Sequence, residues 1–89
     1  MTQDSAKLLV VDDDPSIRHL ISRFFSQRNY EIKSAEDGKS ARVLFENFSP
    51  DLVILDINLP DVNGFNLCQE MQSCSDVYVM MLTSRTDES

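Results

Sequence analysis

The sequence is poor in the residues that build zinc sites, disulfide frameworks and membrane spans. It has one histidine, His19, and two cysteines, Cys68 and Cys74, among 89 residues. So few cysteines and histidines exclude a zinc site with the usual Cys/His spacing. We expect the two cysteines to be free thiols, as in a reducing cytoplasm. The longest apolar run, residues 77–82, is too short to cross a bilayer, and the polar residues 1–6 lack the apolar region of a signal peptide. We therefore expect a cytoplasmic chain without a membrane contact.

Positive charge is also scarce. Eight Lys and Arg residues stand against 15 Asp and Glu, which gives a formal net charge of −7. A nucleic-acid-binding domain needs a basic face, so we do not expect this chain itself to bind nucleic acid. The apolar fraction of 42% and the charged fraction of 26% are typical of a folded globular domain, and the length suggests one domain or part of one.

Apolar periodicity predicts four strands that alternate with three helices. The predicted strands cover about residues 7–11, 30–34, 52–56 and 77–82, and the predicted helices cover about residues 15–28, 39–47 and 64–72. Asp14 and Pro15 are a typical N-cap and first helical residue. The first helix carries an apolar stripe that we expect to face the core: Ile17, Leu20, Ile21, Phe24 and Phe25. The third carries a shorter inner row of Phe65, Cys68 and Met71.

Alternating strands and helices predict an α/β fold, a doubly wound parallel sheet with helices on both faces. Strand 30–34 mixes polar and apolar residues and suits an edge, whereas the other three strands are almost entirely apolar, as interior strands are. The expected strand order is 2-1-3-4 in chain numbering. Ligands in such sheets bind beyond the carboxyl ends of the strands, at the switch point between the first and third strands.

Acidic side chains follow both strands at that switch point. Asp12 and Asp13 come directly after the first strand, and Asp56 ends the third. Neighbouring strands are about 4.8 Å apart, so these carboxylates would repel unless a cation such as Mg²⁺ neutralised them. A carboxylate can also accept a phosphoryl group, and Asp56 fits this nucleophile. Near it, the backbone carbonyl of Asn58 could bind the metal and the hydroxyl of Thr83, at the end of the fourth strand, could bind a phosphoryl oxygen.

Taken together, four segments of the chain resemble the receiver domain of two-component response regulators. They are LLVVDDDPSIR (8–18), AEDG (35–38), DLVILDINLPDVNG (51–64) and VMMLTSR (79–85). The resemblance extends over essentially the whole chain, and the combination of motifs is specific. It implies a flavodoxin-like receiver fold whose output is switched by phosphorylation.

The resemblance also implies roles for individual residues. Asp56 would be the phospho-acceptor and Thr83 the switch hydroxyl. Asp12 and Asp13 would form the acidic pair, with Mg²⁺ bound by Asp13, Asp56 and the backbone carbonyl of Asn58. The phosphoryl donor would be a sensor histidine kinase or a histidine phosphotransfer protein.

The resemblance leaves one part of the receiver pattern unmatched. A receiver has five β/α units, whereas residues 1–89 reach only the fourth strand. We therefore expect a partial receiver domain that lacks the fourth helix, the fifth strand with its lysine, and the fifth helix. The fourth strand then becomes an apolar edge, and such edges recruit other chains. We expect either a piece of a longer protein, in which a DNA-binding output domain could follow, or a homo-oligomer formed through this edge.

Two alternatives to a phospho-accepting switch remain open from the sequence. One is an interaction module that is not phosphorylated. The other is a phosphatase of the haloacid-dehalogenase type, which also uses an aspartate at a strand end, although Asn58 stands where its second acid would be. We expect a stoichiometric acceptor and not an enzyme.

Overall fold

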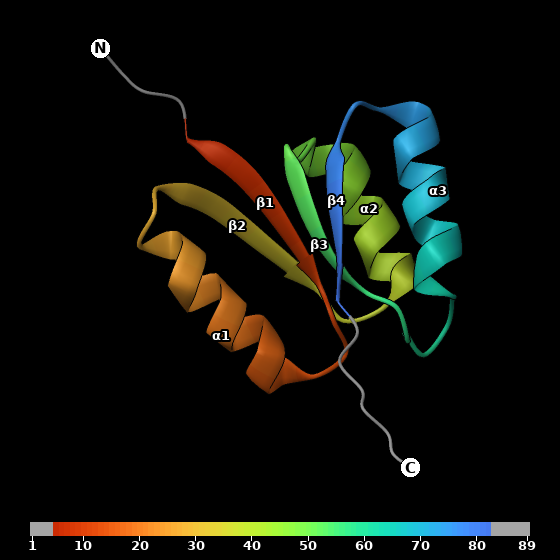
Figure 1. Ribbon diagram of the computed structural model, residues 1–89, viewed down its shortest axis with the longest axis horizontal. Coiled ribbons are helices and arrows are strands. Elements are labelled where there is room, and N and C mark those ends of the chain that lie inside the picture. Colours follow the sequence, from red (N-terminus) through yellow and green to blue (C-terminus); the bar gives the residue numbers. More distant parts are fainter. Residues whose placement is uncertain (1–4, 83–89) are drawn as a thin grey trace.

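A four-stranded parallel sheet forms the centre of the computed structural model, which describes residues 5–82 (Figure 1). The elements in chain order are β1 (Ala6–Val11), α1 (Pro15–Ser26), β2 (Tyr30–Ala35), α2 (Gly38–Phe48), β3 (Leu52–Asp56), α3 (Gly64–Cys74) and β4 (Tyr78–Leu82). The strand order is β2-β1-β3-β4, with every neighbouring pair parallel. The predicted α/β fold and strand order are thus confirmed.

The two central strands are buried on both faces of the sheet. Figure 1 shows α2 and α3 on one face and α1 on the other. Alternate residues divide between two clusters: Leu9, Val11, Val53 and Leu55 pack on the α2 and α3 side, and Leu8, Val10 and Ile54 on the α1 side. This double burial explains why β1 and β3 are continuous apolar runs rather than alternating ones.

Each helix begins with a capping side chain at the carboxyl edge of the sheet. The Asp14 carboxylate accepts the N–H of Ser16 at 2.9 Å, with Pro15 as the first helical residue, as the sequence predicts. Asp37 caps α2 and Asn63 caps α3 in the same way. Because these side chains satisfy N–H groups that a helix leaves unpaired, they fix where each loop ends and each helix starts.

The predicted inward faces of α1 and α3 are partly wrong. Leu20 and Phe24 of α1 are 64% and 49% exposed, and Phe65 of α3 is 55% exposed. In α1 the stripe extends past the sheet, because α1 lies alone on its face of the described chain and no second helix covers the far side. In α3 the buried row is Leu67 and Met71, so Phe65 in the first turn points away from the sheet.

β4 is the outer strand of the described sheet and is partly uncovered. Tyr78 and Met80 are 72% and 48% exposed, which fits the predicted apolar edge. Cys68 and Cys74 are free thiols, as expected. Within residues 5–82, no helix has both the length and the hydropathy needed to cross a membrane.

Candidate functional site

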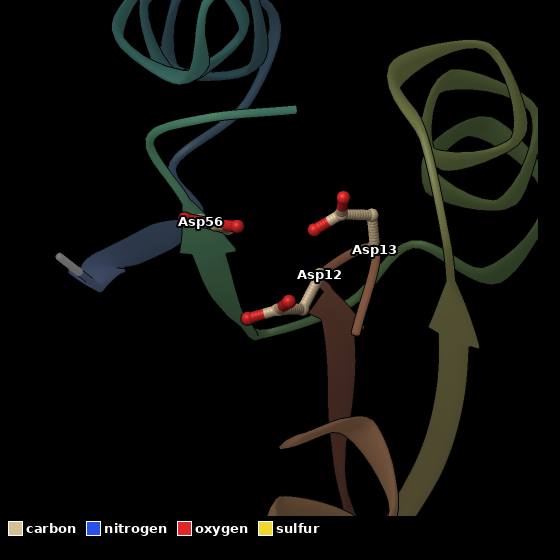
Figure 2. Close-up of side chains that lie close together, drawn as sticks. All are labelled: Asp12, Asp13 and Asp56. Carbon is tan, nitrogen blue, oxygen red and sulfur yellow. The ribbon is translucent and has the colours of Figure 1, made fainter. Parts of the chain in front are cut away.

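Three carboxylates meet at the carboxyl ends of β1 and β3. Asp12 and Asp13 directly follow β1, and Asp56 is the last residue of β3. The strands pair in register, with Val11 opposite Leu55, so the residues that follow them stay adjacent. One oxygen from each of the three carboxylates lies within 4.8 Å of the others. Figure 2 shows the side chains turned into the same gap between the strand ends, as the sequence predicts.

The local environment of Asp12 is unfavourable for a negative charge. Its side chain is only 1% exposed. One carboxylate oxygen, Oδ1, accepts the N–H of Asp14 at 2.9 Å, whereas Oδ2 is buried with no hydrogen-bond partner among the described residues. Burial raises the pKa of Asp12, and the negative charges of Asp56 and Asp13 raise it further, although the Asp14 N–H lowers it.

These residues fit a hard divalent cation. The buried free oxygen of Asp12 needs a positive partner, and carboxylate oxygen is the ligand that Mg²⁺ prefers. Oxygens on one octahedral Mg²⁺ lie about 3.0 Å apart when they are neighbours and about 4.2 Å apart when they are opposite, since each is about 2.1 Å from the ion. The carboxylate oxygens lie within 4.8 Å of one another, so binding one ion requires a rotation of the side chains. Asp13, which is exposed, is free to make it.

The loop after Asp56 folds back onto the end of its own strand. The N–H of Asn58 donates to Oδ1 of Asp56 at 3.2 Å, and the N–H of Gly64 donates to the carbonyl of Ile57 at 2.8 Å. A Cβ on Gly64 would collide with the Asp56 carbonyl and lie 2.7 Å from the Ile57 Cα, so residue 64 must be glycine for this return to form. The loop thus returns to the backbone at the end of β3, and one of its N–H groups bonds the Asp56 carboxylate.

The remaining predicted site residues have different outcomes. Asn58 lies in this loop, two residues beyond Asp56, and is paired with Asn63 by an antiparallel bridge. The role of its carbonyl as a metal ligand stays a prediction. Thr83 follows Leu82 directly in the sequence but lies outside the described residues. Its proposed role stays a prediction.

Two polar contacts that support the site were not predicted from the sequence. The Arg18 guanidinium donates from Nη1 to the carbonyl of Asp12 at 2.7 Å and so ties α1 to the end of β1. The Asp61 carboxylate accepts the N–H groups of Gly38 and Lys39 at the start of α2. Helical spacing, one turn beyond Asp14, could have indicated Arg18. Nothing in the local sequence indicates Asp61, because its partners are 22 and 23 positions away.

The chain matches a known family over most of its length. Residues 8–89 fit the family model of the response regulator receiver domain. The chain belongs to this family. Its members are components of two-component signal transduction.

Curated relatives of this receiver domain include transcriptional regulators. The probable transcriptional regulator ycf27 of Porphyridium aerugineum is 41% identical over 83 residues, which cover 93% of this chain and 35% of that protein. The DNA-binding dual master transcriptional regulator RpaA of Synechocystis is 37% identical over 81 residues, covering 88% and 34%. The chain thus spans about a third of the length of these relatives.

Solved receiver structures share the fold of this chain. The chemotaxis protein CheY4 of Vibrio cholerae superposes with a TM-score of 0.85 at 32% identity, covering 94% of this chain and 72% of that one. A CheY-like receiver domain protein from Methanospirillum hungatei gives a TM-score of 0.88 at 25% identity, covering 94% and 68%. These similarities support the flavodoxin-like receiver architecture already seen in the strand order.

Proposed function

We propose that this receiver domain accepts a phosphoryl group on Asp56 in the presence of Mg²⁺, and that phosphorylation switches a downstream output. The observation that carries the proposal is the cluster of Asp12, Asp13 and Asp56, in which a buried carboxylate oxygen has no hydrogen-bond partner within residues 5–82. Such a cluster is costly for a stable fold unless it serves a cation. Membership of the receiver family adds independent support.

The chemistry follows from the position of the Asp56 carboxylate. The N–H of Asn58 holds Oδ1, which leaves Oδ2 to attack phosphorus. An O–P bond forms as the bond from phosphorus to the donor nitrogen or oxygen breaks, and the leaving group keeps the electron pair. The product is an aspartyl phosphate. Bound Mg²⁺ would neutralise the charge that the carboxylates and the phosphoryl oxygens bring together.

We assign the supporting roles as the receiver motifs suggest. Asp12, Asp13 and Asp56, with the backbone carbonyl of Asn58, would hold Mg²⁺. Thr83 would donate its hydroxyl to a phosphoryl oxygen and so report the phosphorylated state to the adjoining surface. The chain would act as a stoichiometric acceptor and not as an enzyme.

We also propose a setting for this switch. The phosphoryl donor would be a sensor histidine kinase or a histidine phosphotransfer protein in the cytoplasm. The names of the curated relatives support an output that regulates transcription, with DNA binding carried by another part of a longer protein. Within this scheme, residues 1–89 would be a single, partial receiver domain.

The proposal is tested by phosphorylation with acetyl phosphate, a small phosphoryl donor. We expect intact mass spectrometry to show one phosphoryl adduct per chain with Mg²⁺, and none with a chelator or in Asp56→Asn. An equal adduct in Asp56→Asn would overturn the assignment of the acceptor. Steady release of product from p-nitrophenyl phosphate would instead identify a phosphatase.

A further inference from the structure

The Asp61 carboxylate connects two segments that are distant in the sequence. Its Oδ1 accepts the N–H of Gly38 at 2.7 Å, and its Oδ2 accepts the N–H of Lys39 at 3.0 Å. Asp61 lies in the acceptor loop, which we define as residues 57–63 between Asp56 and α3. Both carboxylate oxygens of this exposed residue are therefore bonded to the first turn of α2.

These bonds complete the N-terminus of α2. A helix leaves its first N–H groups without partners inside the helix, and a negative charge there is favourable. Asp37, the N-cap, accepts the N–H of Ser40 at 2.8 Å. Asp61 accepts the two N–H groups before it. Because Asp37 bonds the N–H of Ser40, the N–H groups of Gly38 and Lys39 are left for Asp61 in the acceptor loop.

A steric contact fixes the same junction. A Cβ on Gly38 would collide with Cγ1 of Val62, the residue after Asp61. Gly38 does not adopt a left-handed conformation, so the backbone does not require glycine at this position. Glycine is needed because Val62 approaches closely. The acceptor loop therefore rests on α2 through one polar and one apolar contact.

We infer that Asp61 is a positioning residue for the phospho-acceptor site, because it fastens the acceptor loop to the N-terminus of α2. Three residues before Asp61, Asn58 donates its N–H to Asp56. Its backbone carbonyl would bind the cation under the proposed function. The bridge between Asn58 and Asn63 carries the constraint across the loop. Asp61 thereby controls the geometry of the site without touching the reacting atoms. This inference rests on the function proposed above.

The first test measures phosphorylation against Mg²⁺ concentration in Asp61→Ala. We expect the Mg²⁺ concentration for half-maximal rate to rise about tenfold, as when other outer-shell partners of metal ligands are lost. Asp61→Asn, which keeps one acceptor oxygen, should fall between Asp61→Ala and the parent. The control is Asp51→Ala, because Asp51 also bonds a backbone N–H, that of Lys7 at 2.8 Å, but at the opposite end of the sheet.

The control separates positioning from stability. In a variant that stays almost fully folded without Mg²⁺, a loss of stability leaves the half-maximal Mg²⁺ concentration unchanged, so the comparison is made well below the melting temperature of every variant. We therefore expect Asp51→Ala to keep the parent value even if its melting temperature falls. A value for Asp61→Ala within twofold of the parent would overturn the inference.

The second test needs neither metal nor phosphoryl donor. In the metal-free chain, amide hydrogen exchange should quicken at Gly64 when Asp61 is replaced by alanine. The acceptor of the Gly64 N–H, the Ile57 carbonyl, is unaltered by this substitution, so faster exchange reports a loosened loop. Unchanged exchange at Gly64 would show that Asp61 does not hold the loop.

A third pair of variants approaches the junction from the other side. Gly38→Ala should impair Mg²⁺-dependent phosphorylation because its methyl group displaces Val62. The double variant Gly38→Ala/Val62→Ala removes the collision and should recover most of the loss. Failure of the double variant to recover, with both proteins folded, would contradict the steric part of the inference.

The proposed function and the inference about Asp61 are disproved by different results. If the parent chain takes no phosphoryl group, the proposed function is wrong. The inference is then still decided by Gly64 exchange and by an NMR titration of the parent and Asp61→Ala with Mg²⁺ alone. If the parent is phosphorylated but Asp61→Ala matches it in every readout, only the inference is wrong.

Discussion

At the scale of single residues, Asp12 carries a conflict between stability and cation binding. Its buried Oδ2 has no partner among the described residues, and both burial and the neighbouring carboxylates raise its pKa. The ionised side chain therefore opposes folding when no cation is bound. The same free oxygen is what makes the site suitable for a metal.

This conflict predicts that Asp12→Asn stabilises the fold without a metal and destabilises it when Mg²⁺ is bound. In metal-free solution the variant should be more stable than the parent by about 1 kcal/mol near neutral pH, because an unpaired buried charge is removed. The raised pKa means that the folded parent binds a proton more tightly than the unfolded chain. The stability that this proton gives the folded parent is therefore full at acid pH, below the pKa of Asp12 in the unfolded chain. It is lost as the pH rises from that pKa through the higher pKa of the folded protein.

Chemical denaturation at several pH values measures the difference. The advantage of Asp12→Asn should vanish at acid pH, where Asp12 is protonated and neutral, and should grow as pH rises. With saturating Mg²⁺ the order should reverse, because the variant lacks a ligand. A parent that is more stable than Asp12→Asn in metal-free solution at neutral pH would contradict this account.

The sequence predicts the clustered carboxylates better than the residues whose bonds hold the surrounding backbone. Asp12, Asp13 and Asp56 each end an apolar run, and parallel strands bring such ends to one edge of the sheet. Arg18 and Asp61 act through side-chain bonds to backbone groups. Such bonds depend on how helices and loops settle in three dimensions. Periodicity carries no information about them.

At the scale of elements, the ends of the helices differ in backbone strain. The C-cap residue after α2 is Ser49, whose φ of 52° and ψ of 63° are left-handed, whereas the C-cap after α3 is Ser75, with an extended backbone at φ −158°. A side chain in the left-handed region costs free energy that glycine avoids. Only the first of these two serines should therefore benefit from replacement by glycine.

We expect Ser49→Gly to raise the free energy of unfolding by about 0.5–1 kcal/mol. Ser75→Gly serves as the matched control and should be neutral or destabilising, because it adds freedom to the unfolded chain without relieving strain. Urea denaturation of the three proteins decides the point. Equal effects of the two substitutions would show that the left-handed backbone at Ser49 carries no cost.

The elements themselves are predictable, but the covering of their faces is less so. The strand and helix bounds agree with the sequence to within about two residues because capping residues and prolines mark them. The exposure of Leu20 and Phe24 was not foreseen. An apolar stripe shows that a helix has one side suited to burial. It does not show how much of that side the neighbouring elements cover.

At the scale of the whole molecule, the described chain presents an apolar surface on the α1 face. Tyr78 and Met80 of β4 pair in register with Leu52 and Ile54, and Ile54 packs on the α1 side. Register partners in a sheet point to the same face, so Tyr78 and Met80 are exposed on the α1 face of the sheet, at the edge opposite β2. Apolar strand edges of this kind promote association between chains.

We therefore expect the 89-residue chain to self-associate through β4. Met80→Lys should weaken dimerisation by about tenfold, equivalent to about 1.4 kcal/mol, because it places a charge on the edge strand. The measurement is sedimentation velocity over a range of concentrations. Val43→Lys is the control, since Val43 is 56% exposed on α2, away from β4. Equal dimerisation of Met80→Lys and the parent would exclude β4 as the interface.

The strand order of the molecule follows from simple sequence signals. β2 mixes polar and apolar residues and lies at an edge, and the two most apolar strands with acidic ends, β1 and β3, lie side by side at the centre. The exposure of β4 cannot be predicted in the same way. It depends on which other segments pack against the strand, and the order of polar and apolar residues within β4 does not specify them.

Because the acidic cluster is divided between β1 and β3, binding of Mg²⁺ there would be coupled to folding. Asp13 and Asp56 are more than forty positions apart in the chain and meet only when the two strands pair. An unfolded chain cannot present both, so an ion held by this cluster would bind the folded form alone. By mass action, free Mg²⁺ at a hundred times its dissociation constant would add about 2.7 kcal/mol to the free energy of unfolding. Depletion of magnesium would then lower the amount of folded protein as well as its capacity to be phosphorylated.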